Sequence, residues 1–151
     1  MRPLLLTSSP LFGVLAVLVI AGCAAPRPAA ERAETRRDLT RALIARGWVV
    51  EPTDNADPFG VASRGTAYLV RRRGADARRL VTFEAPPTDD GAPDRDALDA
   101  DYVFLRQRLA GRSAVFYRRP ALLVVTFGAG RTELDLRLIQ LLGLPVTAVE
   151  E

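Results

Sequence analysis

The spacing of apolar residues predicts alternating helices and strands from residue 31 to the end of the chain. Apolar residues recur at helical intervals in three segments, each followed by a glycine. Runs of β-branched and aromatic residues, separated by turn residues, mark five strands. The helices are expected at 31–46, 96–110 and 132–142. The strands are expected at 48–51, 66–72, 79–85, 114–118 and 121–127. The order αβββαββα predicts an α+β fold, with three helices packed on an antiparallel sheet of about five strands.

The strongest β pattern lies in the second half of the chain. Two apolar runs meet at Arg119-Pro120, which predicts a tight hairpin. The second run, residues 122–127, is apolar at nearly every position, which is typical of a central strand buried on both faces. After it, Thr132 and Asp135 have the spacing of a capping box, in which a hydroxyl and a carboxylate each accept a backbone N–H. The last helix is therefore expected to begin here.

The apolar residues of the strands allow two arrangements of the helices. If all three helices packed on one face of the sheet, part of the apolar surface on the other face would be uncovered and available to a partner. If helices lay across both faces, the same residues would be buried. The residues concerned are Tyr68, Val70, Val81, Phe83, Phe116, Leu123, Val125 and Phe127.

The first 22 residues have the pattern of a secretion signal. Arg2 precedes an apolar run at 11–21, and this run is shorter than the roughly 20 residues that a transmembrane helix needs. Ile20-Ala21-Gly22-Cys23 then resembles the lipobox of bacterial lipoproteins. The resemblance implies that residues 1–22 are removed and that Cys23, the only cysteine, becomes a lipid-modified N-terminus. The alternatives are an ordinary cleaved signal and a retained anchor helix.

A lipid on Cys23 would fix the location of the protein. Two or more acyl chains give stable membrane anchoring, at roughly 0.8 kcal/mol per buried CH₂. Residues 23–30 would form the lipidated cysteine and a Pro/Ala-rich tether, and 31–151 a single domain. Ala24 stands where lipoproteins retained at the inner membrane often carry aspartate. The periplasmic side of the outer membrane is therefore favoured if the host has two membranes.

The inventory of reactive side chains argues against catalysis. The sequence has no histidine, its 21 basic residues are all arginine, and its one thiol is the expected lipid site. It contains no Gly-x-Ser-x-Gly motif, phosphate loop or dinucleotide fingerprint. We therefore expect no catalytic, cofactor-binding or metal-binding residues. A pair of carboxylates working as general acid and base is the one enzyme class that this inventory leaves open.

Two charged segments need separate interpretation. The acidic segment 88–101 could suggest a calcium loop, but a loop starting at Asp94 would place Leu98 and Leu105 where oxygen ligands are required. A solvated loop that caps the next helix is favoured. The basic segment 71–79 could contact anionic headgroups or an acidic partner, or protect an edge strand from aggregation. Nucleic acid is not an expected partner, because without Arg2 the chain has 20 arginines against 18 acidic residues.

The domain itself resembles a type of small bacterial lipoprotein or exported protein that has no established activity. The residues that carry this resemblance are PFG at Pro58, VFYRRPALLVVTFG at 115–128 and LIQLLG at 138–143. Related proteins often have a histidine where this chain has Val115, so no functional residue is carried over. The expected function is that of a non-catalytic envelope interaction or assembly module, with an envelope protein as partner. The alternatives are a lipoprotein that binds a small ligand and, less favoured, a carboxylate enzyme.

Overall fold

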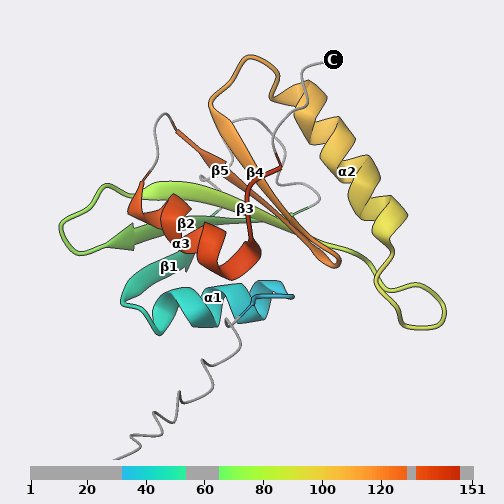
Figure 1. Ribbon diagram of the computed structural model, residues 1–151, viewed down its shortest axis with the longest axis horizontal. Coiled ribbons are helices and arrows are strands. Elements are labelled where there is room, and N and C mark those ends of the chain that lie inside the picture. The colour runs from blue at the N-terminus through green and yellow to red at the C-terminus, as the bar shows by residue number, and fades with distance from the viewer. Residues whose placement is uncertain (1–31, 54–64, 129–131, 147–151) are drawn as a thin grey trace, which may run out of the picture.

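Residues 32–53, 65–128 and 132–146 are described by the structure, a computed structural model. Its elements are α1 (Arg36–Ile44), β1 (Trp48–Pro52), β2 (Thr66–Arg72), β3 (Arg78–Glu84), α2 (Arg95–Arg108), β4 (Ala114–Arg119), β5 (Leu122–Phe127) and α3 (Glu133–Leu142). The α+β prediction is confirmed in the number, type and order of these elements (Figure 1). Within the described ranges, no helix combines the length and apolar character that crossing a bilayer requires.

The sheet is antiparallel throughout, in the order β1-β2-β3-β5-β4. β1, β2 and β3 follow one another as a meander, and β5 then inserts between β3 and β4. Its central position explains the apolar character of its sequence, since Leu122, Leu123, Val124 and Val125 are fully buried in alternation on the two faces. β5 is therefore the internal strand that the sequence predicts.

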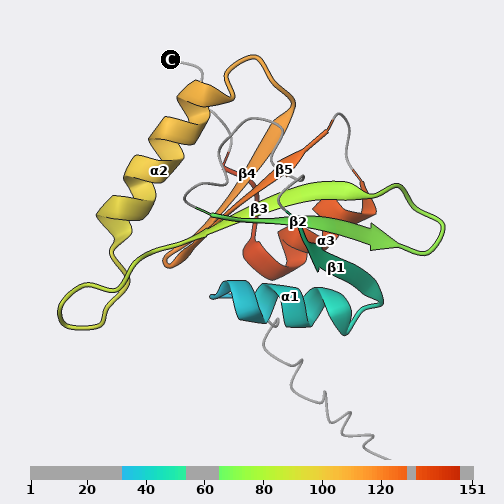
Figure 2. The ribbon, with the colours of Figure 1, turned by 180° about the vertical axis from the view of Figure 1, so that it is seen from behind.

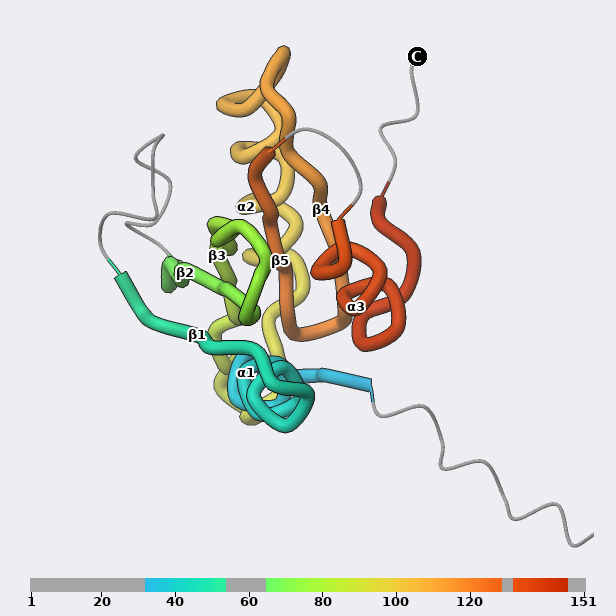
Figure 3. Tube along the Cα trace, turned by 90° about the vertical axis from the view of Figure 1, so that its left-hand side faces the viewer, coloured from blue at the N-terminus to red at the C-terminus, as the bar shows by residue number. Residues whose placement is uncertain are grey.

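The helices divide between the two faces of the sheet. One cluster of buried residues joins α1 and α3 to the face that carries Tyr68, Leu80 and Val124. The other joins α2 to the opposite face, through Phe83 and Val125 among others. α1 and α3 accordingly lie near each other, and α2 lies away from both (Figures 2 and 3). The arrangement with all three helices on one face is wrong. α2, which connects β3 to β4 in the chain, packs on the second face and buries residues there.

The first helix is shorter than its sequence pattern predicts. It begins at Arg36 and not at residue 31, because the Thr35 hydroxyl accepts the backbone N–H of Asp38 at 3.1 Å and caps the helix. The preceding residues run alongside α3, where the Ala33 N–H donates to the Leu141 carbonyl at 3.0 Å. This contact holds the start of the described chain against the first face of the sheet.

Caps formed by side chains set the other two helix starts. Asp94 accepts the Ala97 N–H at 3.0 Å at the start of α2, as the favoured reading of the acidic loop predicts. The predicted capping box of α3 is also present: Asp135 accepts the Thr132 N–H at 2.8 Å, and Thr132 accepts the Asp135 N–H at 3.3 Å. Asp135 further lies 3.3 Å from the Tyr117 hydroxyl, so the same carboxylate joins α3 to the sheet.

Candidate functional site

Several residues named from sequence lie outside the described part of the chain. They include the signal at 1–22, Cys23, the tether through residue 30, and Pro58. The described part of the chain begins at residue 32, just after the tether, and Ala33 is already buried. The lipid attachment of Cys23 therefore stays a prediction.

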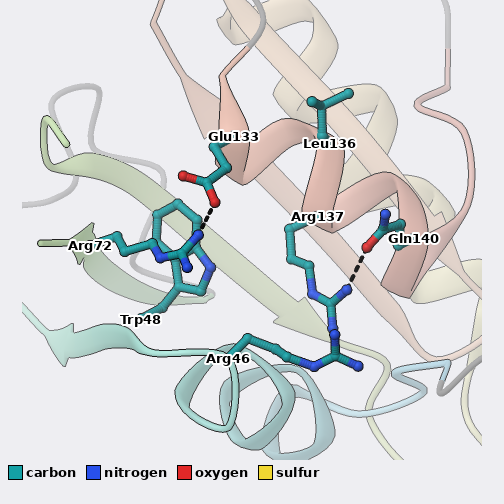
Figure 4. A pocket seen from close by; sticks show the side chains of 7 residues that line it. All are labelled: Arg46, Trp48, Arg72, Glu133, Leu136, Arg137 and Gln140. Carbon is teal, nitrogen blue, oxygen red and sulfur yellow. Dashed lines mark hydrogen bonds and ion pairs between the residues drawn. The ribbon is translucent and has the colours of Figure 1, made fainter. Parts of the chain in front are cut away.

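A cavity of about 340 Å³ opens on the first face of the sheet, between the end of α1, the start of β1, the end of β2 and one side of α3. Arginines predominate among the residues that line it, together with one carboxylate and the only tryptophan of the chain. The lining residues are Arg46, Trp48, Arg72, Glu133, Leu136, Arg137 and Gln140 (Figure 4). This cavity is the candidate site.

Local backbone geometry places the α1 side of the cavity. α1 ends at Ile44, and Gly47 takes a φ of +82°, a conformation that residues with a Cβ rarely adopt. The chain thereby reverses from helix to strand within three residues. Arg46 is left exposed at the rim, while Trp48 enters β1 with only 5% of its surface exposed.

Helical spacing places the α3 side of the cavity. Glu133 and Arg137 are four residues apart and Gln140 is three residues further on, so the three side chains share one face of α3. The Arg137 guanidinium donates to the Gln140 side-chain oxygen. Leu136 adds an exposed apolar side chain beside them.

Ion pairing and stacking fix Arg72 against Trp48. Its guanidinium carbon lies 5.9 Å from the centre of the indole ring, within the range of a cation–π contact. The same guanidinium forms an ion pair with Glu133. A carboxylate from α3 is thus already bound in the cavity, which shows that this wall can hold an oxyanion.

The charges of the cavity are not balanced among the side chains that line it. Three guanidinium groups face a single carboxylate. Arg46 forms no ion pair with any other residue in the described part of the chain. Its guanidinium and that of Arg137 point toward each other (Figure 4). This arrangement favours binding of an anion.

The basic segment at 71–79 is only partly free to meet a partner. Arg71 pairs with Glu51 at 2.8 Å across β1 and β2, and Arg72 enters the cavity. The sequence identified Arg72 as part of this charged block, gave no sign that Arg46 would join it, and gave only an indirect sign of Arg137. The one available signal was the Glu133–Arg137 spacing after the capping box.

The acidic segment at 88–101 is built into turns and helix ends. The Thr88 hydroxyl donates to Asp90, whose carboxylate also accepts the Ala92 N–H at 3.2 Å. These bonds lower the pKa of Asp90, the Thr88 hydroxyl being the larger cause. Asp99 forms an ion pair with Arg118 of β4. Among the described residues, no group of three or more histidine, cysteine, aspartate or glutamate side chains is placed to hold a metal ion.

A second, smaller cavity of about 130 Å³ lies beside α1. Its lining includes Asp38 and Arg41, whereas the larger cavity includes Glu133. Each of these two cavities thus has a single carboxylate. Neither has the facing pair of carboxylates that most glycoside hydrolases use.

Tyr68 lies near the N-terminal end of α1, where charged groups also meet. Arg36 and Glu84 form an ion pair at 3.2 Å, and Glu84 accepts the Arg36 backbone N–H at 2.9 Å. Burial is the main cause that raises the pKa of Tyr68, and Arg36 opposes it. Tyr68 belongs to the buried cluster that includes Leu39 and Leu43 of α1, so its ring helps to pack α1 on the sheet.

Comparison of the chain with family models, with curated proteins and with solved structures finds no match in any of the three. Any function assigned to the chain therefore comes from its own residues and their geometry.

Proposed function

We propose that this chain is a bacterial lipoprotein, anchored to an envelope membrane through a lipid on Cys23, whose domain is a non-catalytic binding module. The observation that carries the proposal is the sequence Ile20-Ala21-Gly22-Cys23 at the end of an apolar run too short to cross a bilayer. A short Pro/Ala-rich segment separates it from the folded domain. Seven residues, 24–30, reach at most about 25 Å when fully extended, so the domain would work close to the membrane surface.

The side chains of the described domain support binding over catalysis. The sequence has neither histidine nor lysine, and the larger cavity is lined mainly by guanidinium, amide and apolar groups, which hold ligands. The proposed partner is an envelope component, and the periplasmic side of the outer membrane is the proposed location if the host has two membranes.

The anchor is tested by mass spectrometry of the full-length protein made in bacteria with its own signal. The mature N-terminal peptide of the wild type should start at Cys23 and carry diacylglycerol and acyl mass. Cys23→Ser should carry none and should leave the membrane fraction or retain its signal. An unmodified Cys23, or a mature N-terminus elsewhere, would contradict the anchor.

The partner is tested by cross-linking the tagged, full-length protein in its native membranes. One envelope protein should be recovered reproducibly from the wild type and lost with Cys23→Ser, because tethering brings the two together. Recovery of the monomer alone from both variants would contradict an envelope-protein partner and leave the anchor unaffected.

The cavity at Trp48 favours a second candidate function, the binding of a small ligand. Its volume of about 340 Å³ lies at the lower end of the range of about 300–1,000 Å³ typical of small-molecule sites. It combines an apolar wall with polar groups that could orient a ligand. This function is compatible with the anchor and needs no protein partner.

A further inference from the structure

The cavity at Trp48 gathers positive charge from three separate parts of the chain. Arg46 comes from the end of α1, Arg72 from β2 and Arg137 from α3. Like charges repel, so three guanidinium groups around one space are unfavourable unless an anion lies among them. Glu133 supplies one negative charge and is paired with Arg72. Arg46 and Arg137 are the other two guanidinium groups of the lining, and Arg137 also donates to the Gln140 side-chain oxygen.

We propose that this cavity binds a small anionic ligand through a carboxylate or phosphate group held between Arg46 and Arg137. Guanidinium groups bind such oxyanions with two parallel hydrogen bonds, and these are stronger than bonds between neutral groups. The inference rests on the binding role proposed above and names its ligand class. It does not depend on the lipid.

The walls of the cavity indicate what else the ligand carries. Leu136 is an exposed apolar side chain on α3, and the Trp48 indole forms part of the floor. These two side chains would give an apolar segment of a few carbon atoms a surface to contact. The volume admits a small molecule and no folded partner.

Glu133 acts in this proposal as an internal competitor for the ligand. Its carboxylate occupies Arg72 and repels a second anion in the same space. The free site is therefore partly neutralised, which limits the unfavourable meeting of arginines when no ligand is bound. Removing this carboxylate should strengthen ligand binding, which is the opposite of what removing an arginine should do.

Calorimetric titration of the full-length protein in a nonionic detergent tests the site, with inorganic phosphate and citrate as probes. Sodium chloride keeps the ionic strength equal in every titration, because exposed charges are screened by salt. The fluorescence of Trp48, the only tryptophan, reports binding independently. Binding of either probe supports the proposal, and the preferred probe distinguishes phosphate from carboxylate recognition.

Variants locate the binding within the molecule. Arg46→Gln and Arg137→Gln should each lower the affinity for the probe by about tenfold, the usual effect of losing a hydrogen bond to a charged group. Glu133→Gln should raise the affinity several-fold. The matched control is Arg108→Gln, since Arg108 is an exposed arginine on α2, across the sheet, and should leave the affinity unchanged. Circular dichroism confirms that each variant is folded.

Three outcomes would overturn the site. They are no binding of either probe at tens of millimolar, equal affinity in the Arg46, Arg137 and Arg108 variants, and weaker binding by folded Glu133→Gln. The N-terminal mass of the same preparation reports the lipid on Cys23. A lipidated protein that fails to bind thus overturns the cavity proposal alone, and an unlipidated protein that binds overturns the anchor alone.

Discussion

The two faces of the sheet are covered in different ways. On the first face, α1 and α3 pack side by side over Trp48, Leu80 and Tyr117. On the second face, α2 alone packs over Val81, Phe83 and Val125. The outer side of α2 exposes Val103 and Phe104 by 52% and 48%, whereas the charged cavity lies on the first face.

This difference explains why the candidate site lies where it does. Two helices that meet over one face leave a gap where their side chains diverge, and groups from α1, α3 and the strands below can all reach it. On the other face, α2 packs against the described strands through Leu98, Leu105 and its C-cap residue Leu109. Concave sites form where several elements meet, and the cavity at Trp48 lies where the end of α1, β1, β2 and α3 come together.

Truncation of one core leucine on each face should produce the largest effects and separate the two faces. Leu138 of α3 and Leu105 of α2 are both fully buried, so Leu138→Ala and Leu105→Ala should each lower the free energy of unfolding by about 2–5 kcal/mol. Only Leu138→Ala should also weaken phosphate or citrate binding, since Leu138 packs the helix that carries Arg137. Urea denaturation and calorimetry measure the two effects.

The milder substitutions Leu138→Met and Leu105→Met provide a second pair if an alanine variant does not fold. Equal losses of anion binding from both faces would show that the cavity depends on the whole domain, and the functional contrast between the faces would be wrong.

Asp135 is the polar link between α3 and the first face, and its removal should have the next largest effect. Its carboxylate accepts the Thr132 N–H at 2.8 Å and lies 3.3 Å and 3.4 Å from the hydroxyls of Tyr117 and Thr126. Asp135→Ala removes this acceptor from the buried hydroxyls of Tyr117 and Thr126 and from the Thr132 N–H, so stability should fall by about 1–3 kcal/mol. Asp135→Asn keeps one acceptor oxygen and should lose less, as urea denaturation would show. Equal losses from the two variants would contradict this role.

Much of the first face could be predicted from sequence, because its signals are local. The capping box at Thr132 and Asp135 and the leucine stripe of α3 lie within one turn or two of each other, and both are present. The start of α1 could not be found, because charged residues from 31 to 35 suit a helix as well as an extended chain. Contact between Ala33 and Leu141, far away in sequence, selects the extended form.

The cavity could not be predicted, because its residues come together only through the path of the sheet. Arg72 and Arg137 are 65 positions apart in sequence, and nothing near either indicates the other. The placement of α2 is equally non-local. Both faces of the sheet have apolar residues at strand spacing, so the sequence does not indicate which face α2 covers. That face is set by the path of the connection from β3 to β4, which contains α2.

Gly65 tests how tightly the second face is packed, with a smaller expected effect. A Cβ added here would lie 2.6 Å from the Thr82 carbonyl oxygen and 2.9 Å from the Phe83 ring. The oxygen belongs to the backbone and cannot rotate away, so Gly65→Ala should cost roughly 1–2 kcal/mol through overpacking. At Gly111 an added Cβ would meet no atom within 4 Å, but the φ of Gly111 is +74°. Gly111→Ala therefore measures the cost of backbone strain without overpacking, for comparison with Gly65→Ala. A stability of Gly65→Ala equal to that of the wild type would mean that the start of β2 can move away from Phe83.

The smallest effect is expected at Asp90, in the turn that leads from the sheet to α2. Its pKa lies below the ordinary value of 3.8 because the ionised carboxylate accepts hydrogen bonds, first from Thr88 and then from the Ala92 N–H. Protonation removes these bonds, so the turn is stabilised above pH 3.8 and loses this contribution as the pH falls through the lowered pKa. Thr88→Val should raise the pKa of Asp90 toward 3.8, measured by NMR titration of its carboxyl carbon, while Thr40→Val on α1 should not change it. An unchanged pKa in Thr88→Val would assign the shift to the backbone of the turn.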